Sequence, residues 1–597
     1  AMLSICGLAA VAAGAILTGP TLLLAFLMTG CAWCLLVSIP AFILSWIPPV
    51  RRLFAWLLRR KMLSLGCLVI LIALFYSFEN WRGRRAWQSF KQEREAKGER
   101  FDAASFIPPP VPDDRNFFET PLWTNLHFVQ TNGAIVWSDT NRANHAIFDA
   151  FGPESHNAPN PGRWSKAERV DLEAWQKFYR GSNNVFAADQ AAADAFRKRY
   201  GLDWAPVPAE GVPGAETAPA PVSNSPTTNY FPIAREPQSP ADDVLLALSR
   251  FETNRQLLIA AAARPQARFW INYGAGFGAL IPHLARIKAS AQYLSLHASA
   301  ALEAGDRDTA LEDVKLSFRL IEAVRSEPIL ISHLVRIATQ ALAMQPVWEG
   351  LADRQWTEAE LRVIESELGK LDFLADYHFA MRCERAWNVW AVDYIRKQGM
   401  LELDAMVSPQ RKTPPMVVMG NMVGIRLIPA GWFDQNKLSL CRLYEKYLLP
   451  RVAVQDRRVD SPASIRESNS PLTKQRLRPY DMLSRILLPA LGGTAERCAQ
   501  GQTFTDLARV ACALERYRLA SGQFPETLAE LAPKFIEKLP HDVINGQPLN
   551  YRRTDDGRFV LYSVGWNETD DGGKIGLTKN GNLDRKQGDW VWQYPAS

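Results

Sequence analysis

The side chains of this sequence that are best suited to bind a metal ion gather close to its C-terminal end. The stretch YSVGWNETDDGG, residues 562–573, follows the apolar run FVLYSV. The candidate ligands are Asn567, Asp570, Asp571, Asp584 and Asp589. Calcium takes about six to eight oxygen ligands, and the paired glycines 572 and 573 would let the backbone bend toward an ion. The sequence therefore predicts one calcium site within residues 565–589. The alternative is a solvated turn, which acidic residues and glycines favour by themselves.

Motifs that carry catalysis are absent from the sequence. It contains no HExxH zinc motif, no Walker phosphate loop and no GxSxG nucleophile motif. His378, Cys383 and Glu384 fall on one predicted helix, where a buried or capping histidine is a commoner outcome than a metal ligand. Three other histidines are expected in separate helices and could meet only through the fold: His283, His297 and His333. We therefore assign no catalytic or organic-cofactor residues.

The glycine-rich stretch YGAGFG, residues 273–278, has the GxGxG spacing of a phosphate-binding turn. Dinucleotide-binding turns of this kind follow a strand and open a helix within a βαβ unit. No strand is expected before residue 273. The sequence therefore favours a role for these glycines in helix packing.

Long charge-free segments at the N-terminal end predict membrane helices. Residues 2–47 and 62–78 carry no charged side chain, and a helix of about 20 apolar residues spans a bilayer. The first segment is too long for one span and contains a Gly-Pro pair. We therefore expect spans at 3–18 and 21–46, and a third at 62–78. Residues 1–78 form the predicted membrane region.

The positive charge of the chain is concentrated beside these segments. The net charge is +6, yet residues 1–100 hold 12 Lys and Arg against 4 Asp and Glu, and the remainder is close to neutral. Basic side chains next to a bilayer attract anionic headgroups. We therefore expect lipid headgroups as partners near residues 51–61 and 82–94, and no nucleic acid. The two sides of the third span carry equal numbers of Lys and Arg, so charge does not set the orientation.

Changes in composition divide the rest of the chain. A charged helix over 79–105 precedes three consecutive prolines, which form a rigid extended spacer. The expected segments are a membrane-proximal helix and proline-rich spacer at 79–119, a small mixed domain at 120–204, a linker rich in Pro, Ala and Ser at 205–240, a helical domain at 241–400, an irregular polar connector at 401–480, and a C-terminal domain at 481–597.

The helical domain begins with recognisable end signals. Ser239 is a suitable N-cap, and Pro240 suits the first turn. Small residues at 298, 301 and 310 flank the turn Gly305-Asp306. This spacing lets two helices approach closely and is typical of a tetratricopeptide-like hairpin. Further antiparallel helices are expected at 329–350 and 357–371.

The C-terminal segment predicts a helix followed by a small sheet. Thr503-Phe-Thr-Asp506 fits a capping box at the start of a helix that Gly522 ends. A short second helix is expected after Pro525. PLNYRR and RFVLYSV then form a hairpin across an Asp-Gly turn, and GDWVW follows as the last strand.

This order of elements resembles the globular head of type II secretion pseudopilins. The residues that carry the resemblance are Phe524, Pro525, Pro540, Asp542, Gly546, Pro548, Tyr551, Tyr562, Gly565, Asp570 and Asp571. The resemblance covers the C-terminal segment alone. It implies a calcium loop after the hairpin and a periplasmic location. The N-terminal pilin signature is missing, so no polymerising pilin is implied.

A second resemblance extends over more of the chain. ENWRGRRAW at 79–87 and PPPVPDDRNF at 108–117, together with the acidic stretch, are similar to a family of large, uncharacterised membrane-anchored proteins of planctomycete and verrucomicrobial bacteria. This resemblance implies no activity.

The sequence as a whole predicts an α+β protein that is predominantly helical. It would have N-terminal transmembrane helices, a helical-repeat-like middle region and a small pseudopilin-like C-terminal domain. The expected function is that of a membrane-anchored scaffold, or of an accessory subunit of an envelope complex, that binds other membrane or envelope proteins. The alternative is an envelope-associated, hydrolase-like enzyme with a site assembled from separated residues. The expected location is the bacterial inner membrane, with the bulk of the chain in the periplasm.

Overall fold

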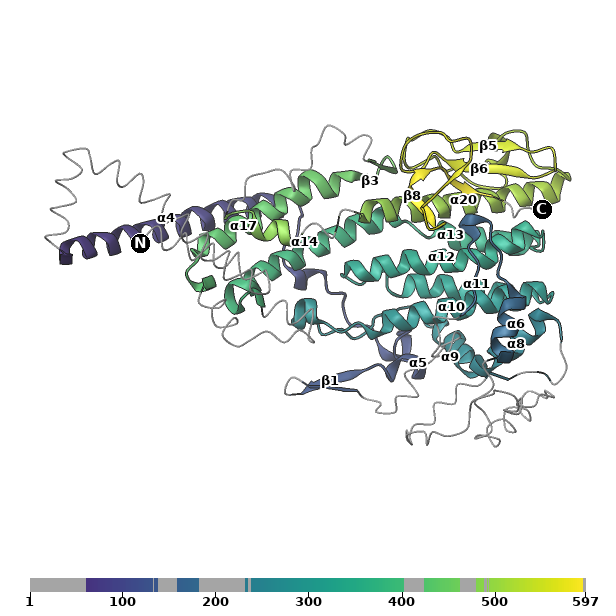
Figure 1. The fold of residues 1–597 in the computed structure, drawn as a ribbon, viewed down its shortest axis with the longest axis horizontal. Helices are drawn as coiled ribbons and strands as arrows, with labels where there is room; N and C mark the ends of the chain where they lie inside the picture. The colour runs from purple at the N-terminus through teal and green to yellow at the C-terminus, as the bar shows by residue number, and fades with distance from the viewer. Residues whose placement is uncertain are drawn as a thin grey trace.

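The protein is mostly helical, with small sheets at its edges (Figure 1). The computed structural model describes residues 61–131, 134–137, 158–181, 231–232, 234, 238–401, 424–461, 479–487, 491 and 493–593. The predicted spans at 3–18 and 21–46 lie outside the described residues, as does most of the predicted linker at 205–240.

The third predicted span and the charged segment after it form one continuous helix, α4 (Lys61–Glu95). Within the described part of the chain, one helix is long and apolar enough to cross a membrane, and it is this one, from Leu63 onward. The helix ends at Glu95 and does not reach residue 105 as expected. A separate short 3-10 helix occupies Ala103–Phe106, where Asp102 caps the first turn.

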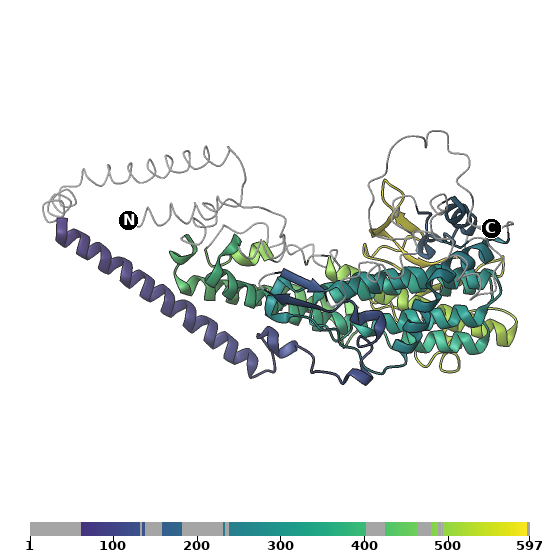
Figure 2. The ribbon, with the colours of Figure 1, turned by 90° about the horizontal axis from the view of Figure 1, so that it is seen from below.

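The two halves of α4 have different surroundings. The first half projects away from the other described elements (Figure 2), and many of its apolar side chains are exposed: Leu63, Leu65, Val69, Ile70, Leu71, Leu74 and Phe78. The second half packs along α17 (Ala430–Leu443) and buries Trp87 and Phe90. The segment 401–480 is therefore not only a polar connector, because α17 contributes Leu440 and Cys441 to the core.

Helices occupy most of the predicted helical domain, with their ends close to the expected positions. Helices α10 (Pro282–Glu303) and α11 (Arg307–Ala323) form the predicted hairpin, and Asp306 caps α11 by accepting the backbone N–H of Thr309. The neighbouring helices are α8 (Pro240–Leu248), α9 (Glu252–Ala262), α12 (Leu330–Ala352), α13 (Glu358–Gly369) and α14 (Phe373–Gln398). Ser239 caps α8 as predicted.

The shorter elements lie around this bundle. They are α5 (Pro121–Thr124), α6 (Leu172–Gly181), α19 (Met482–Leu487), and two small hairpins, β1 (Phe128–Thr131) with β2 (Ala134–Trp137) and β3 (Val452–Ala453) with β4 (Arg458–Val459).

The C-terminal part consists of a long helix covered by a sheet. Helix α20 (Thr494–Ser521) starts earlier than the predicted capping box, so Thr503 and Asp506 are buried in its middle. The predicted hairpin is present as β5 (Asn550–Arg553) and β6 (Phe559–Ser563), and β9 (Trp590–Trp592) pairs with β6. A second hairpin joins β7 (Ile575–Leu577) and β8 (Leu583–Gly588). The short second helix is a 3-10 helix, Leu528–Leu531.

The hydrophobic core does not follow the segment boundaries expected from the sequence. One cluster joins side chains of α4, the bundle, α17, α20 and the C-terminal sheet. Trp164 comes from the predicted mixed domain, and its ring lies 4.7 Å from that of Phe504 and 5.5 Å from that of Trp592. Segments separated by hundreds of residues thus share one core.

Candidate functional site

The predicted calcium loop lies where β6 ends and β9 begins. Asp589 precedes β9 and is 1% exposed. Its carboxylate accepts two backbone N–H groups of the acidic stretch, from Asp571 at 3.2 Å and from Gly573 at 2.6 Å. Burial raises the pKa of Asp589, and the charges of Asp571 and Asp570 add to the rise. The fold therefore brings three carboxylates into mutual repulsion, which a cation would relieve.

Of the other predicted ligands, Asn567 bonds to Asp571, whereas Asp570 bonds to Tyr562 and to the backbone of Gly572. Asp570 Oδ1 accepts the hydroxyl of Tyr562 at 3.0 Å and the N–H of Gly572 at 2.9 Å. The Asn567 side-chain amide donates to Asp571 Oδ2 at 3.2 Å. Glycines 572 and 573 have φ values of 72° and 82°, which lets the backbone turn at this point.

Asp584 lies on β8, where its carboxylate accepts the nearby backbone N–H of Lys586 at 2.9 Å. Hydrogen bonds therefore join Asn567, Asp571 and Asp589. The bonds of Asp570 go to Tyr562 and Gly572, and that of Asp584 goes to Lys586. Over the described ranges, no group of three or more His, Cys, Asp or Glu side chains has the geometry to hold a metal ion. A calcium ion here would need backbone carbonyls and water as additional ligands.

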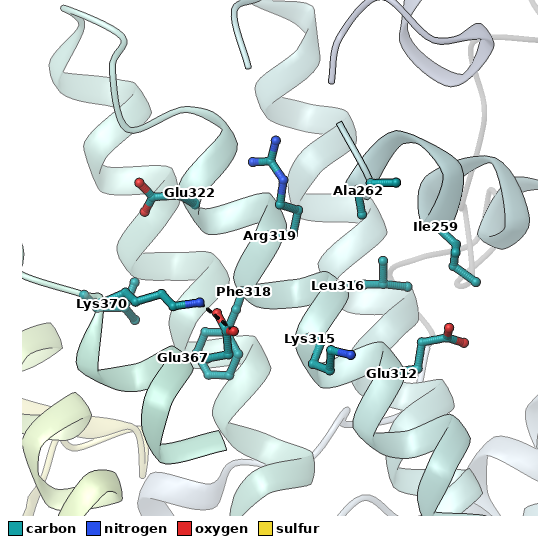
Figure 3. A pocket seen from close by; sticks show the side chains of 12 residues that line it. Ile259, Ala262, Glu312, Lys315, Leu316, Phe318, Arg319, Glu322, Glu367 and Lys370 are labelled. Atoms are coloured by element: carbon teal, nitrogen blue, oxygen red, sulfur yellow. Dashed lines mark hydrogen bonds and ion pairs between the residues drawn. The ribbon is translucent and has the colours of Figure 1, made fainter. Parts of the chain in front are cut away.

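A groove of about 420 Å³ lies between α9, α11 and α13 (Figure 3). This volume is within the range of ligand pockets in proteins, about 300–1,000 Å³. Its surface combines apolar side chains such as Leu316 with acidic and basic side chains on the rim. Lys370 and Glu367 pair across one turn at 2.7 Å, and Lys315 is exposed.

Arg319 in the groove is fixed by the fold. Its guanidinium lies 4.9 Å from the centre of the Phe117 ring and donates to the carbonyl of Arg264 at 2.8 Å. Burial lowers the pKa of Arg319, although Glu322 opposes this effect. A rigid basic group beside apolar side chains can recognise a segment of another protein that offers carbonyl oxygens or a carboxylate.

A buried polar cluster forms where α10 meets the start of α12. His283 Nε2 lies 2.7 Å from Glu327 Oε1, and the Ser332 hydroxyl donates to Glu327 Oε2. His333 Nε2 lies 3.1 Å from the Glu327 carbonyl oxygen. Burial lowers the pKa of His333 to about 3, with a further contribution from Arg336, so the ring stays neutral. Ser332 bonds to the carboxylate and not to a histidine, which differs from the arrangement of an activated nucleophile.

The prediction that three histidines lie in three separate helices is wrong for two of them. His283 and His297 lie on one helix, α10, and not on separate helices. His297 pairs with buried Asp313 at 2.5 Å, and Arg255 donates to the same carboxylate at 2.7 Å. Burial lowers the pKa of Arg255, but the charges of Asp313 and Glu312 outweigh it and raise the value above its usual range. This ion-pair group ties α9, α10 and α11 together.

The remaining candidates serve packing or local bonding. His378 Nε2 contacts the carbonyl of Val452 at 2.6 Å, and Cys383 is buried. Burial raises the pKa of Glu384 to about 7, and Asn388 partly opposes the rise. The stretch Tyr273–Gly278 is a short helical turn that packs on Trp390, in agreement with the packing role predicted for it.

Comparison of the chain with protein-family models, with curated proteins and with solved structures found no match.

Proposed function

We propose that this chain is a membrane-anchored scaffold that binds other envelope proteins through its helical domain. The observation that carries the proposal is the construction of α4. Its exposed apolar half and its buried half belong to one uninterrupted helix. An apolar helix of this kind is stable in a bilayer, and its continuation buries Trp87 and Phe90 in the main core. A membrane anchor would therefore hold the helical domain rigidly.

The groove between α9, α11 and α13 is the proposed protein-binding surface. It lies between three helices, and its mixture of apolar and charged groups is suited to a peptide segment. The partners are expected among membrane and envelope proteins. The pseudopilin-like order of α20 and the sheet β5–β6–β9 supports a periplasmic location and an accessory role in an envelope complex.

Calcium binding at the loop 565–589 is a further part of the proposed function. It is supported by the buried Asp589, by the hydrogen bonds that link Asn567 and Asp589 to Asp571, and by the raised pKa of Asp589. The ion would stabilise the connection between β6 and β9. Lipid headgroups near residues 51–61 and 82–94 remain the expected electrostatic partners.

Membrane anchoring is tested by carbonate extraction of the full chain from native membranes. We expect the protein to stay in the membrane fraction, and complete release would contradict the proposal. Protease added to intact spheroplasts should digest the bulk of the chain. Digestion only after lysis would reverse the orientation.

Partner binding is tested by photo-cross-linking in cells. The photo-reactive residue p-benzoylphenylalanine replaces Lys315 at the groove or, as a matched control, the exposed Lys288 on α10, which is not part of the groove. We expect a discrete protein adduct from position 315 and none from position 288. No adduct from position 315, or equal adducts from both, would argue against a protein-binding groove.

An enzyme is the second candidate function. The observation in its favour is that Ser332, Glu327 and His283 lie together, because some hydrolases use these residue types, although here Ser332 bonds to the carboxylate and not to His283. All three side chains are 3% exposed or less, which opposes direct contact with a substrate. Hydrolysis of an envelope component by the purified chain, lost on Ser332→Ala, would support the enzyme over the scaffold.

A further inference from the structure

We propose that the segment Gly424–Trp432, a turn together with the first residues of α17, lies on the membrane surface as a second lipid contact beside α4. This inference rests on the proposed membrane anchoring. It adds a site whose contact with α4 joins two residues 351 positions apart in the sequence, Tyr76 and Leu427. The occupant of this surface is the headgroup and upper acyl region of the bilayer.

Direct contacts place the turn at the end of the apolar half of α4. The Tyr76 hydroxyl donates to the carbonyl oxygen of Leu427. The rings of Phe75 and Trp432 meet edge to face, with centroids 6.3 Å apart, and Trp432 Nε1 donates to Glu79 Oε2 at 3.0 Å. The turn is therefore level with residues 75–79 of α4.

The length of the apolar half of α4 indicates where residues 75–79 lie relative to the bilayer. Residues 61–78 form a helix of roughly 27 Å, at 1.5 Å per residue, and the hydrocarbon core of a bilayer is about 30 Å thick. If the apolar half spans the core, residues 75–81 lie at one interface. Phe78 and Trp81 are both 56% exposed there. Tryptophan and tyrosine are favoured at this depth, which agrees with the aromatic contacts of the turn.

The exposed groups of the turn have the chemistry of a lipid contact. Leu427 is 40% exposed, and its neighbour Arg426 is exposed as well. Arg84 and Arg85 are exposed on the adjoining turn of α4. At a membrane surface, an apolar side chain of this kind is buried at the boundary of the acyl chains. The guanidinium groups of its basic neighbours then reach the lipid phosphates.

The relative direction of α4 and α17 indicates how a second lipid contact would affect the orientation of the protein on the membrane. The N–H of Gly431 donates to Asn80 Oδ1 at 2.9 Å, and Arg94 pairs with Glu445 at 2.9 Å further along. The two helices therefore run parallel, and both leave the interface in the same direction. Two adjacent lipid contacts would restrict the tilt of the protein about its anchor.

The test is photo-cross-linking of the full chain in vesicles of phosphatidylcholine and phosphatidylglycerol. The residue p-benzoylphenylalanine replaces Leu427, Leu71 in the apolar half of α4, or Leu577 on β7. Leu577 is 53% exposed on β7, which pairs with β8, and Figure 1 shows β8 well away from the apolar half of α4. We expect lipid adducts from positions 71 and 427 and no lipid adduct from position 577. Thermal unfolding of each variant, compared with the unmodified chain, checks that the substitution leaves the fold intact.

The outcomes separate this inference from the proposed anchoring. Lipid adducts from position 71 without any from position 427 would overturn the inference and leave the anchor intact. No lipid adduct from position 71 would contradict the anchoring by α4 itself. Adducts from position 427 to protein alone would assign the surface to a protein partner and overturn the lipid contact. Arg426→Glu should reduce the adduct at position 427 in anionic vesicles and leave that at position 71 unchanged.

Discussion

Gly83 and Gly431 bring the backbones of α4 and α17 into direct contact. A Cβ atom added to Gly83 would lie 2.1 Å from the carbonyl oxygen of Gly431, and one added to Gly431 would lie 2.0 Å from the carbonyl oxygen of Glu79. Distances this short leave no room for any side chain. The absence of side chains at these two positions therefore allows the helix that carries the proposed anchor to pack on the rest of the protein.

Replacement of Gly431 by alanine should separate the two helices and destabilise the protein. Overpacking of a close contact costs about 1–3 kcal/mol. This contact involves backbone atoms that cannot move aside, so we expect the upper part of that range. Thermal unfolding of the full chain in detergent measures the effect.

The matched control for this substitution is Gly66→Ala in the apolar half of α4. An added Cβ there meets no atom within 4 Å. We expect unchanged or slightly increased stability for this variant, because alanine has the higher helix propensity. Equal unfolding temperatures for Gly431→Ala and Gly66→Ala would contradict the close packing of α4 on α17.

Calcium should raise the unfolding temperature of the full chain. A ligand that binds only the folded loop stabilises it by about 2.7 kcal/mol at a hundred times its dissociation constant. The measurement is a thermal melt with calcium and with a chelator. We expect Asp571→Asn to abolish the difference, and Asp556→Asn, in the exposed β5–β6 turn, to preserve it. The same melting curve in calcium and in chelator for the unaltered chain would identify the loop as a solvated turn.

Asp506 should make the stability of the protein depend on pH. Burial raises its pKa from 3.8 to about 6, although Arg457 and Arg509 oppose the rise. Between about pH 4 and pH 6 the folded state then keeps a proton that the unfolded state loses. The free energy of unfolding therefore falls as the pH rises through this window, by roughly 3 kcal/mol at about 1.4 kcal/mol per pH unit.

Asp506→Asn removes this titration and retains the shape of the side chain. We expect the variant to gain stability relative to the unaltered chain as the pH rises from 4 to 6, and to keep a constant advantage above pH 6. Thermal unfolding of both proteins at several pH values tests this expectation. If the difference in unfolding temperature between the two proteins stays constant from pH 4 to pH 7, the pKa of Asp506 is not raised in the folded state.

Removal of the Glu327 carboxylate should destabilise the junction between α10 and α12. Glu327→Ala leaves the Ser332 hydroxyl and His283 Nε2 without their buried partner. Each unsatisfied buried group costs about 1–3 kcal/mol. The exposed Glu303→Ala on α10 is the control and should unfold like the unaltered chain. Similar unfolding temperatures for both variants would show that the cluster contributes little to stability.

The sequence by itself determined elements whose signals are local. The charge-free run at 62–78 predicts a membrane helix because a bilayer selects for uninterrupted apolar side chains, and α4 contains this run. The turn at Gly305-Asp306 predicted the α10–α11 hairpin, because these residues end one helix and cap the next. The Asp-Gly turn similarly predicted the hairpin of β5 and β6, although its two-residue form would shift the register by one residue from the observed pairing of Arg553 with Phe559.

Tertiary packing decided the features that lack a local signal. Residues 79 and 431 come together because two glycines allow a close crossing, and nothing in either segment alone indicates the other. The capping pattern at Thr503 was misleading, since burial against the bundle extends α20 back to Thr494 and overrides the local preference. The meeting of His283, Ser332 and His333 around Glu327 likewise depends on how α10 packs on α12. Local chemistry thus fixed the individual helices and turns, and long-range burial alone determined which of them share a core.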